Sequence, residues 1–214
     1  MTSRLNEVYS ACDLGIQRST DGGQTWQLVN NTGANPVIAY CTDVAVKDSL
    51  ILGAAISNGI LRSGDNGTTW SLVANGFNSQ SVSSVDVCNT KLIAGTYGDG
   101  IYTSVDAGNT WSQTAAAGDQ INDITVTGNI VLAAGNAGLW RSDDGGSTWT
   151  NVSATSYSKL SSSNNFVVAA SASFVHVSSD GGLTFPDQFN LTPGTILTSL
   201  YCSPTDIYYG TLNE

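Results

Sequence analysis

The stretch STDGGQTW, residues 19–26, decides the fold, because near-copies of it recur four more times along the chain. They are SGDNGTTW at 63–70, SVDAGNTW at 104–111, SDDGGSTW at 142–149 and SSDGGLTF at 178–185. The aspartates of successive copies are 44, 41, 38 and 36 residues apart. A period near forty residues, built from strands, is typical of a β-propeller or a related array whose units bury their faces against one another.

Every copy keeps the pattern Ser-x-Asp-x-Gly-x-Thr followed by an aromatic residue. The shared positions are Ser19, Asp21, Gly23, Thr25, Trp26, Ser63, Asp65, Gly67, Thr69, Trp70, Ser104, Asp106, Gly108, Thr110, Trp111, Ser142, Asp144, Gly146, Thr148, Trp149, Ser178, Asp180, Gly182, Thr184 and Phe185. In a tight turn the Asp accepts backbone N–H groups, the Gly adopts positive φ and the aromatic ring buries apolar area. We therefore interpret the motif as a structural turn. A Ca²⁺ site is disfavoured, because most copies offer one carboxylate and Ca²⁺ takes six to eight oxygen ligands.

The segments between the motifs predict the rest of each repeat. A pair of short apolar runs precedes each motif, as in KLIAGTY and GIYTS, and a short run such as WSLV and a further alternating stretch such as INDITVT follow. Each run has the length and β-branched content of a strand. Four strands per repeat, which we call A to D, predict an all-β chain of four-stranded antiparallel blades. We expect residues 1–214 to form one propeller domain of about 5.5 sequence repeats.

The two ends of the chain predict how the ring closes. The N-terminal segment NEVYSACDLGIQRS reads as strands B and C without an A, whereas GTILTSLYCSPTDIYYGT after the last motif reads as A and B. We expect five blades, closed by the C-terminal strand A joining the N-terminal blade, which removes open sheet edges. One strand B is then left over. It is disordered or pairs with a second copy in a strand-sharing homo-oligomer, or the chain comes from a longer, amplified or designed array.

Composition limits the partners. The 7 Lys and Arg against 17 Asp and Glu give a net charge of −10, which disfavours nucleic acid and anionic membranes. The sequence shows neither a transmembrane run nor a signal peptide, while its Ser, Thr, Asn and Gly content favours a secreted or cell-surface location. The cysteines Cys12, Cys41, Cys88 and Cys202 form no CxxC pair, so we expect buried free thiols and no metal or cofactor, although an exported chain allows three disulfide pairings.

The motif resembles the Asp-box, or BNR repeat, of sialidases, other glycoside hydrolases, sortilin-type receptors and photosystem II assembly and stability factors. GIQRSTDGGQTW and GLWRSDDGGSTW are most similar to the last group. The resemblance extends from about Val8 to about Gly210. It implies a propeller whose boxes are structural and lie on the face opposite the usual ligand site, and it says little about activity.

Strand direction also separates two faces. The A–B and C–D turns lie at one end of each blade, and the B–C turns and D–A links lie at the other. Because the boxes occupy the first face, we expect a ligand on the second. The candidate residues on this ligand face are Asp13, Asn58, Tyr97, Asp99 and Asn136.

Single residues give little sign of catalysis. Glycoside hydrolysis normally needs two carboxyl groups, or a Tyr nucleophile with a Glu partner, and the glutamates here are Glu7 and Glu214 at the chain ends. Arg18, Arg62 and Arg141 precede three boxes, and we interpret them as packing between blades.

His176, Tyr102 and Trp140 share one column of strand C, where we expect simple packing. If Tyr102 and Trp140 are exposed, they are candidates for stacking on a sugar or a protein.

These observations predict a non-enzymatic propeller that binds a protein partner as an assembly scaffold. The alternative is a lectin-like module with one sugar per blade, and a sialidase-like hydrolase is the least favoured. Residues on the ligand face vary between blades, which favours one asymmetric partner over several identical sugar sites.

Overall fold

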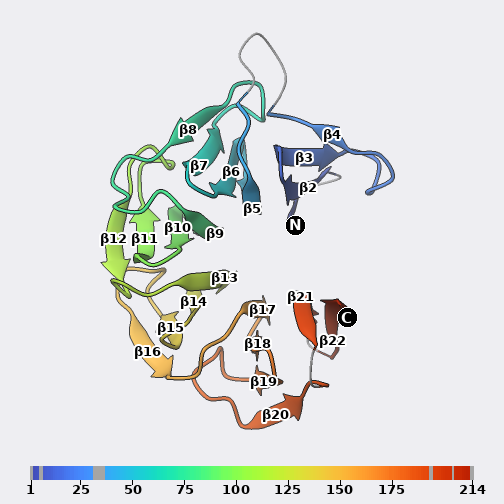
Figure 1. Cartoon of the computed structure of the whole chain (residues 1–214), viewed down its shortest axis with the longest axis vertical. Helices are drawn as coiled ribbons and strands as arrows, with labels where there is room; N and C mark the ends of the chain where they lie inside the picture. The colour runs from blue at the N-terminus through green and yellow to red at the C-terminus, as the bar shows by residue number, and fades with distance from the viewer. Residues whose placement is uncertain (1, 5–6, 31–36, 193–194, 204, 213–214) are drawn as a thin grey trace.

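The computed structural model describes residues 2–4, 7–30, 37–192, 195–203 and 205–212, and their secondary structure consists of strands. Five four-stranded antiparallel sheets and one two-stranded sheet follow one another in chain order around a central opening (Figure 1). The chain is therefore a β-propeller, and we number its sheets as blades 1 to 5 followed by a half-blade.

Each blade is one sequence repeat, with strand A beside the opening and strand D on the outside (Figure 1). Blade 1 contains β1 (Thr2–Arg4), β2 (Glu7–Cys12), β3 (Gly15–Ser19) and β4 (Gln27–Leu28). Blade 2 contains β5 (Cys41–Lys47), β6 (Leu50–Ala55), β7 (Gly59–Ser63) and β8 (Ser71–Val73). Blade 3 contains β9 (Val82–Cys88), β10 (Lys91–Thr96), β11 (Gly100–Ser104) and β12 (Ser112–Ala115).

The later blades repeat this order. Blade 4 contains β13 (Ile121–Thr127), β14 (Ile130–Gly135), β15 (Leu139–Ser142) and β16 (Thr150–Ser153). Blade 5 contains β17 (Lys159–Ser163), β18 (Phe166–Ala170), β19 (Phe174–Ser178) and β20 (Asp187–Asn190). The half-blade contains β21 (Ile196–Cys202) and β22 (Ile207–Leu212).

The core is divided into layers between neighbouring blades. Strand B of blades 2 to 5 is buried almost throughout, because both of its faces meet another blade. One layer, for example, joins Leu52 and Ile60 of blade 2 to Val85 and Leu92 of blade 3. This double burial explains why strand B reads as a continuous apolar run rather than as an alternating one.

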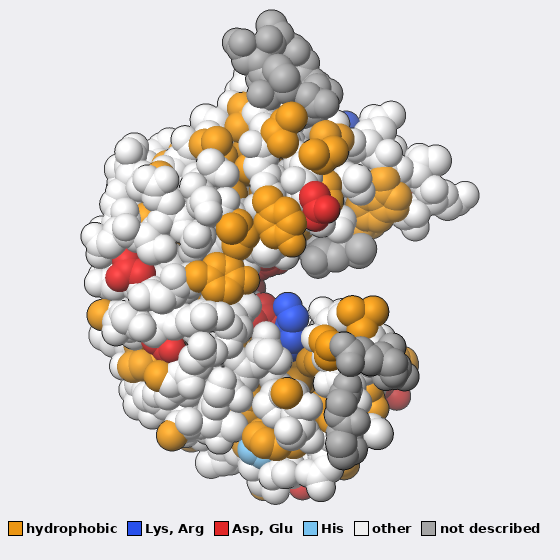
Figure 2. Space-filling model, in the orientation of Figure 1, with side chains coloured by type: hydrophobic (Ala, Val, Ile, Leu, Met, Phe, Trp, Pro, Cys, Tyr) orange, Lys and Arg blue, Asp and Glu red, His pale blue; other side chains and the backbone are white. Residues whose placement is uncertain are grey.

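The expected ring closure is wrong. Blade 1 has its own strand A, because Thr2–Arg4 pairs with β2, and the C-terminal strand A pairs with β22 instead. The segment TSR is too short and too polar to stand out as a strand in the sequence. Since the inner position of blade 1 is already occupied, the five complete blades are continuous in sequence and form an open arc (Figures 1 and 2).

The half-blade shows one apolar face to solvent. Leu197, Leu200 and Ile207 pack against blade 5. Tyr201 and Tyr208 are 61% and 60% exposed, and their rings lie 6.2 Å apart. The strand-sharing homo-oligomer remains a prediction.

Candidate functional site

The five boxes adopt one hydrogen-bonded geometry. In each, the Ser hydroxyl donates to the Asp Oδ1 at 2.7–2.9 Å and accepts the N–H of the box Gly at 2.8–2.9 Å. The Thr N–H donates to the same Oδ1 at 2.8–3.0 Å, and the Thr hydroxyl donates to Oδ2 at 2.5–2.7 Å. Because these bonds use both oxygens of the carboxylate within one turn, the structural interpretation of the box is supported.

The same donors stabilise the charged form of the carboxylate. Hydrogen bonds from the box Thr, followed by the other turn donors, lower the pKa of Asp21, Asp65 and Asp106 to about 2. The pKa of Asp144 and that of Asp180 are lowered for the same reason. The box aspartates are therefore poor candidates for proton transfer at neutral pH.

Each box needs two successive left-handed residues, where the sequence had indicated one. The residue before the box Gly also has positive φ, as in Gly22, Asn66, Ala107, Gly145 and Gly181. Three of these five positions are glycine, which tolerates this region without steric penalty. Ala107, at φ 59°, is the position where a Cβ carries the full penalty.

Two of the three arginines before the boxes join neighbouring blades, as expected, whereas Arg18 lies 3.6 Å from Glu7 of its own blade. Arg62 Nε donates to the carbonyl of Ala107 at 2.7 Å, and Arg141 Nε donates to that of Gly181 at 2.8 Å. Both acceptors occupy the position before the box Gly of the next blade. Arg62 and Arg141 therefore hold the turn of the next blade in place, and the arginines before the boxes do not form a cluster that could bind an anion.

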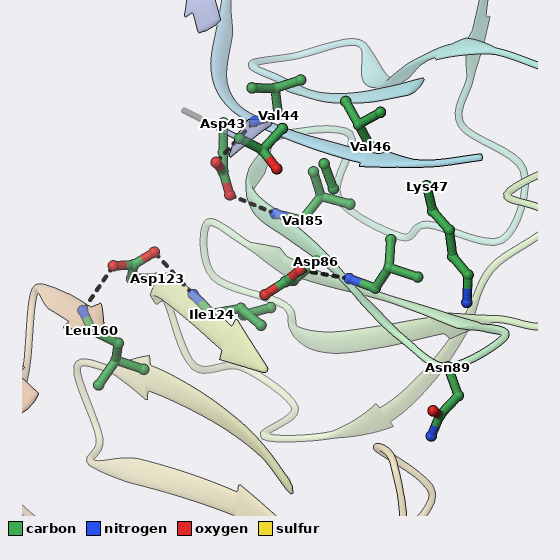
Figure 3. A pocket seen from close by; sticks show the side chains of 13 residues that line it. Asp43, Val44, Val46, Lys47, Val85, Asp86, Asn89, Asp123, Ile124 and Leu160 are labelled. Atoms are coloured by element: carbon green, nitrogen blue, oxygen red, sulfur yellow. Dashed lines mark hydrogen bonds between the residues drawn. The ribbon is translucent and has the colours of Figure 1, made fainter. Parts of the chain in front are cut away.

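A second set of side chains links strand A of one blade to strand A of the next, at the wall of the channel (Figure 3). Asp43 Oδ2 accepts the N–H of Val85 at 3.0 Å, and Asp123 Oδ2 accepts the N–H of Leu160 at 2.8 Å. Ser84 lies in the same register and accepts the N–H of Ile124 at 3.1 Å. These bonds satisfy N–H groups on the innermost strand, whose channel side has no neighbouring strand.

Two carboxyl groups of this wall behave oppositely to those of the boxes. Burial, with Coulombic repulsion from neighbouring aspartates, raises the pKa of Asp86 and that of Asp123 to about 7. Val87 N–H donates to Asp86 at 2.7 Å, and Lys159 partly opposes the shift at Asp123. A cavity of about 540 Å³ lies against these residues and Asp43.

This acidic wall was not predicted from the sequence. Its signal is a single Asp inside a strand A rich in β-branched residues, as in residues 41–47 and 121–127. A charge on an inner strand indicates a side chain that faces the channel or satisfies a neighbouring strand.

The opening of the channel on the B–C and D–A face forms a cavity of about 510 Å³, which we call the channel mouth. Its lining includes Asp13, Tyr40, Asp43, Tyr97 and Lys159. The two tyrosines are 50% and 42% exposed, so aromatic surface meets charges of both signs. Large hydrophobic side chains gather near the opening, with acidic and basic side chains inside (Figure 2).

The five candidate ligand-face residues do not form one site. Asp13 and Tyr97 line the channel mouth, and Asn136 lies with Tyr97 in an adjoining hollow of about 440 Å³. Asp99 instead accepts the Tyr102 hydroxyl and, at 3.2 Å, the N–H of Ser79, which makes it a structural link. Asn58 lies in a B–C turn, where its N–H meets the Ala55 carbonyl at 3.5 Å.

The residues in the strand C column differ in burial more than expected. Tyr102 is fully buried, so it is unavailable for stacking on a ligand, whereas Trp140 and His176 are half-buried. His176 lies between Tyr157 Oη, 2.6 Å from its Nδ1, and Gln188 Oε1, 3.0 Å from its Nε2.

Three further findings concern the described residues. The four cysteines are free thiols, and Cys12 is half-buried while Cys41, Cys88 and Cys202 are buried. In this part of the chain no group of three or more His, Cys, Asp or Glu is placed to hold a metal ion. It also contains no helix long and apolar enough to cross a membrane.

Comparison with known proteins identifies the repeat. The family model of the BNR/Asp-box repeat matches residues 17–28. No curated protein matches the chain significantly.

Solved structures similar to the chain include the designed protein Ika8, with a TM-score of 0.75, 14% identity and coverage of 98% of this chain and 66% of that one. YCF48 bound to D1 peptide has a TM-score of 0.67 and 16% identity, with 95% and 70% covered. The GH74 enzyme of Niastella koreensis has a TM-score of 0.66 and 19% identity, with 86% and 36% covered. The chain thus spans about two thirds of the designed protein and about a third of the GH74 enzyme, and these likenesses show the fold alone.

Proposed function

We propose that this Asp-box β-propeller is a non-catalytic scaffold that holds a protein partner at its channel mouth. The observation that carries the proposal is the pair Tyr40 and Tyr97, each about half exposed beside one cavity. Tyrosine is enriched in protein interfaces, because a rigid aromatic ring provides contact area and its hydroxyl provides a hydrogen bond. The boxes, on the opposite face, hold the blades that present these side chains.

The charges at the channel mouth indicate which kind of partner surface would bind there. Asp13, Asp43 and Asp123 line the mouth together with the single cation Lys159, and the whole chain carries a net charge of −10. A partner with a basic patch is therefore attracted to this face, which raises the rate of association. The structure of YCF48 bound to a peptide offers a precedent for peptide binding by a propeller of similar fold.

The non-catalytic part of the proposal rests on how the acidic side chains are used. Asp43 and Asp123 accept backbone N–H groups of the next blade, and the box carboxylates are occupied within their own turns. Glu7 accepts the Tyr9 hydroxyl at 2.7 Å and lies 3.6 Å from Arg18. A glycosidase needs a general acid and a second carboxylate free to act on the same bond.

A lectin with one sugar per blade is not favoured. Repeated sugar sites need the same side chains at equivalent places, and the D–A links differ from blade to blade. Phe77, Asp119 and Tyr157 illustrate this variation.

The test is site-specific photo-crosslinking. A benzophenone amino acid replaces Tyr97 at the mouth or, as the matched control, the exposed Leu183 in the box of blade 5. We expect a discrete adduct from position 97 and none from position 183. The crosslinked protein, identified by mass spectrometry and purified, should bind wild type about tenfold more tightly than Tyr97→Ala.

Equal adducts from both faces, or an affinity that Tyr97→Ala leaves unchanged, contradict the proposed surface. Assays of glycoside hydrolysis test the non-catalytic part separately. Turnover that a single Asp→Asn change abolishes would show that the protein is an enzyme.

A further inference from the structure

The D–A link after each of blades 2, 3 and 4 places one side chain against strand C of the next blade. The contacted residue occupies one register position, because Tyr102, Trp140 and His176 pair with Ala94, Ala133 and Ala169 of their own strand B. The three junctions can therefore be compared at a structurally equivalent position.

Two of the junctions are closed by an aromatic ring. Phe77 lies 4.8 Å from the Tyr102 ring and 5.2 Å from the Trp111 ring, measured between centroids. Tyr157 lies 5.7 Å from the His176 ring and 6.3 Å from the Phe185 ring. Both Phe77 and Tyr157 are buried, so apolar packing fills these two inter-blade spaces.

The junction of blades 3 and 4 carries a carboxylate instead. Phe77 and Asp119 follow left-handed Gly76 and Gly118, and each donates its N–H to the carbonyl three residues earlier. Asp119 is only 7% exposed, and its oxygens accept the Ala137 N–H at 3.0 Å and Trp140 Nε1–H at 3.1 Å. Because the carboxylate is shorter than a ring, a cavity of about 670 Å³ remains, lined by Asp119, Gln120, Asn136, Trp140 and small residues. We call it the inter-blade pocket.

The lining offers an apolar wall with donors and acceptors at its edge. Trp140 is half-buried and fixed through its ring N–H, while Ala116, Ala117 and Ala137 add flat apolar surface. Gln120 Nε2 donates to Asn122 Oδ1, and Asn122 Nδ2 donates to Asn136 Oδ1, each at 3.1 Å. These bonds leave Gln120 Oε1 as an acceptor and Asn136 Nδ2 as a donor.

We propose that the inter-blade pocket binds one neutral sugar residue. A pyranose has an apolar C–H face that stacks on an aromatic ring, and its hydroxyls both donate and accept hydrogen bonds. A cation would use only the acceptors, and an anion would meet Asp119 with no basic residue in the lining. This site is independent of the protein partner, because the channel mouth has a different lining centred on Tyr40 and Asp43.

The test uses a printed array of neutral, sialylated and sulfated glycans, followed by calorimetric titration with the neutral glycan of highest signal. Ala117→Tyr should fill the pocket, since Ala117 is exposed and has no positive φ in the structure. We expect wild type to bind neutral glycans with one site per chain and Ala117→Tyr to lose about tenfold in affinity or more. The matched control is Asn75→Tyr, at the exposed equivalent position before Gly76, and it should bind like wild type.

An array without neutral binders overturns the proposal, as does a stoichiometry of several sugars per chain. Unchanged affinity in Ala117→Tyr, with the melting temperature of the variant equal to that of wild type, also overturns it. A failure here leaves the crosslinking result at Tyr97 unaffected, because that experiment reports on the channel mouth.

Discussion

The box aspartates and the channel aspartates place one kind of side chain in opposite electrostatic settings. A box carboxylate receives the box Ser hydroxyl, backbone N–H groups and the Thr hydroxyl at a solvent-exposed turn, and the pKa of Asp106 falls to about 2. Asp86 at the channel receives fewer donors beside other carboxylates, and desolvation raises its pKa to about 7. Donors lower the pKa of the carboxyl group in both settings, but at Asp86 they do not outweigh desolvation and repulsion from neighbouring aspartates.

The two sets of aspartates also differ in how far apart in the sequence the residues that they join lie. The bonds of a box join residues at most four positions apart, whereas Asp43 reaches Val85, 42 residues further along the chain. The boxes therefore stabilise single turns, and the channel side chains stabilise the stacking of blades. Variants of both sets should change how stability depends on pH, those of the boxes at acidic pH and those of the channel near neutral pH.

The largest effect that we expect is that of Ser142→Ala in the box of blade 4. The Ser142 hydroxyl is buried and accepts the Gly146 N–H at 2.8 Å, so its removal leaves a buried donor unsatisfied. The free energy of unfolding should fall by about 1–3 kcal/mol. Urea titration measures the loss, and Ser112→Ala on an exposed strand D is the control, with an expected change within about 0.5 kcal/mol. Equal losses in both variants would show that the buried box hydroxyl contributes no more to stability than an exposed one.

The next prediction concerns the channel. The pKa of Asp86 in the folded protein, about 7, lies above the value of 3.8 for an unperturbed Asp. The unfolded chain therefore releases this proton first, and the stabilisation that is complete below pH 4 is lost as the pH rises towards 7. Asp86→Asn removes the titrating group, so the melting temperature of the variant should depend less on pH between 5 and 8 and exceed that of wild type at pH 8. Parallel pH profiles would contradict the raised pKa.

The boxes predict the opposite slope at acidic pH. The pKa values of Asp21, Asp65 and Asp106 in the folded protein are about 2, below the value of 3.8 for an unperturbed Asp. Their stabilisation is complete above pH 4 and is lost as the pH falls towards 2, because the unfolded chain binds protons first. Thermal melts of wild type and Asp106→Asn should therefore converge as the pH is lowered from 5 to 2. A constant difference over this range would assign the effect of Asp106 to packing.

The comparison also explains what the sequence could predict. The box is local, so its Ser, Asp, Gly and Thr reveal the turn by spacing alone, and the apolar runs reveal strands A to C. The short strand β1 has only three polar residues and no such signal. The channel links and the inter-blade pocket depend on which side chain meets the neighbouring blade. That property follows from the register between blades. Neither the role of Asp43 nor the exchange of Phe77 for Asp119 could therefore be predicted from the sequence.

The smallest effect that we expect concerns one backbone angle in the box of blade 3. Ala107 is held at φ 59° between Asp106 and Gly108, where its Cβ is strained. Ala107→Gly should raise the free energy of unfolding by about 1 kcal/mol, because the strain removed outweighs the added entropy of the unfolded chain. Calorimetry of the variant measures the gain, and Ala117→Gly, at a link residue without positive φ, should instead be neutral or destabilising. A loss at position 107 would mean that the Arg62 bond to its carbonyl, and not the turn itself, selects this conformation.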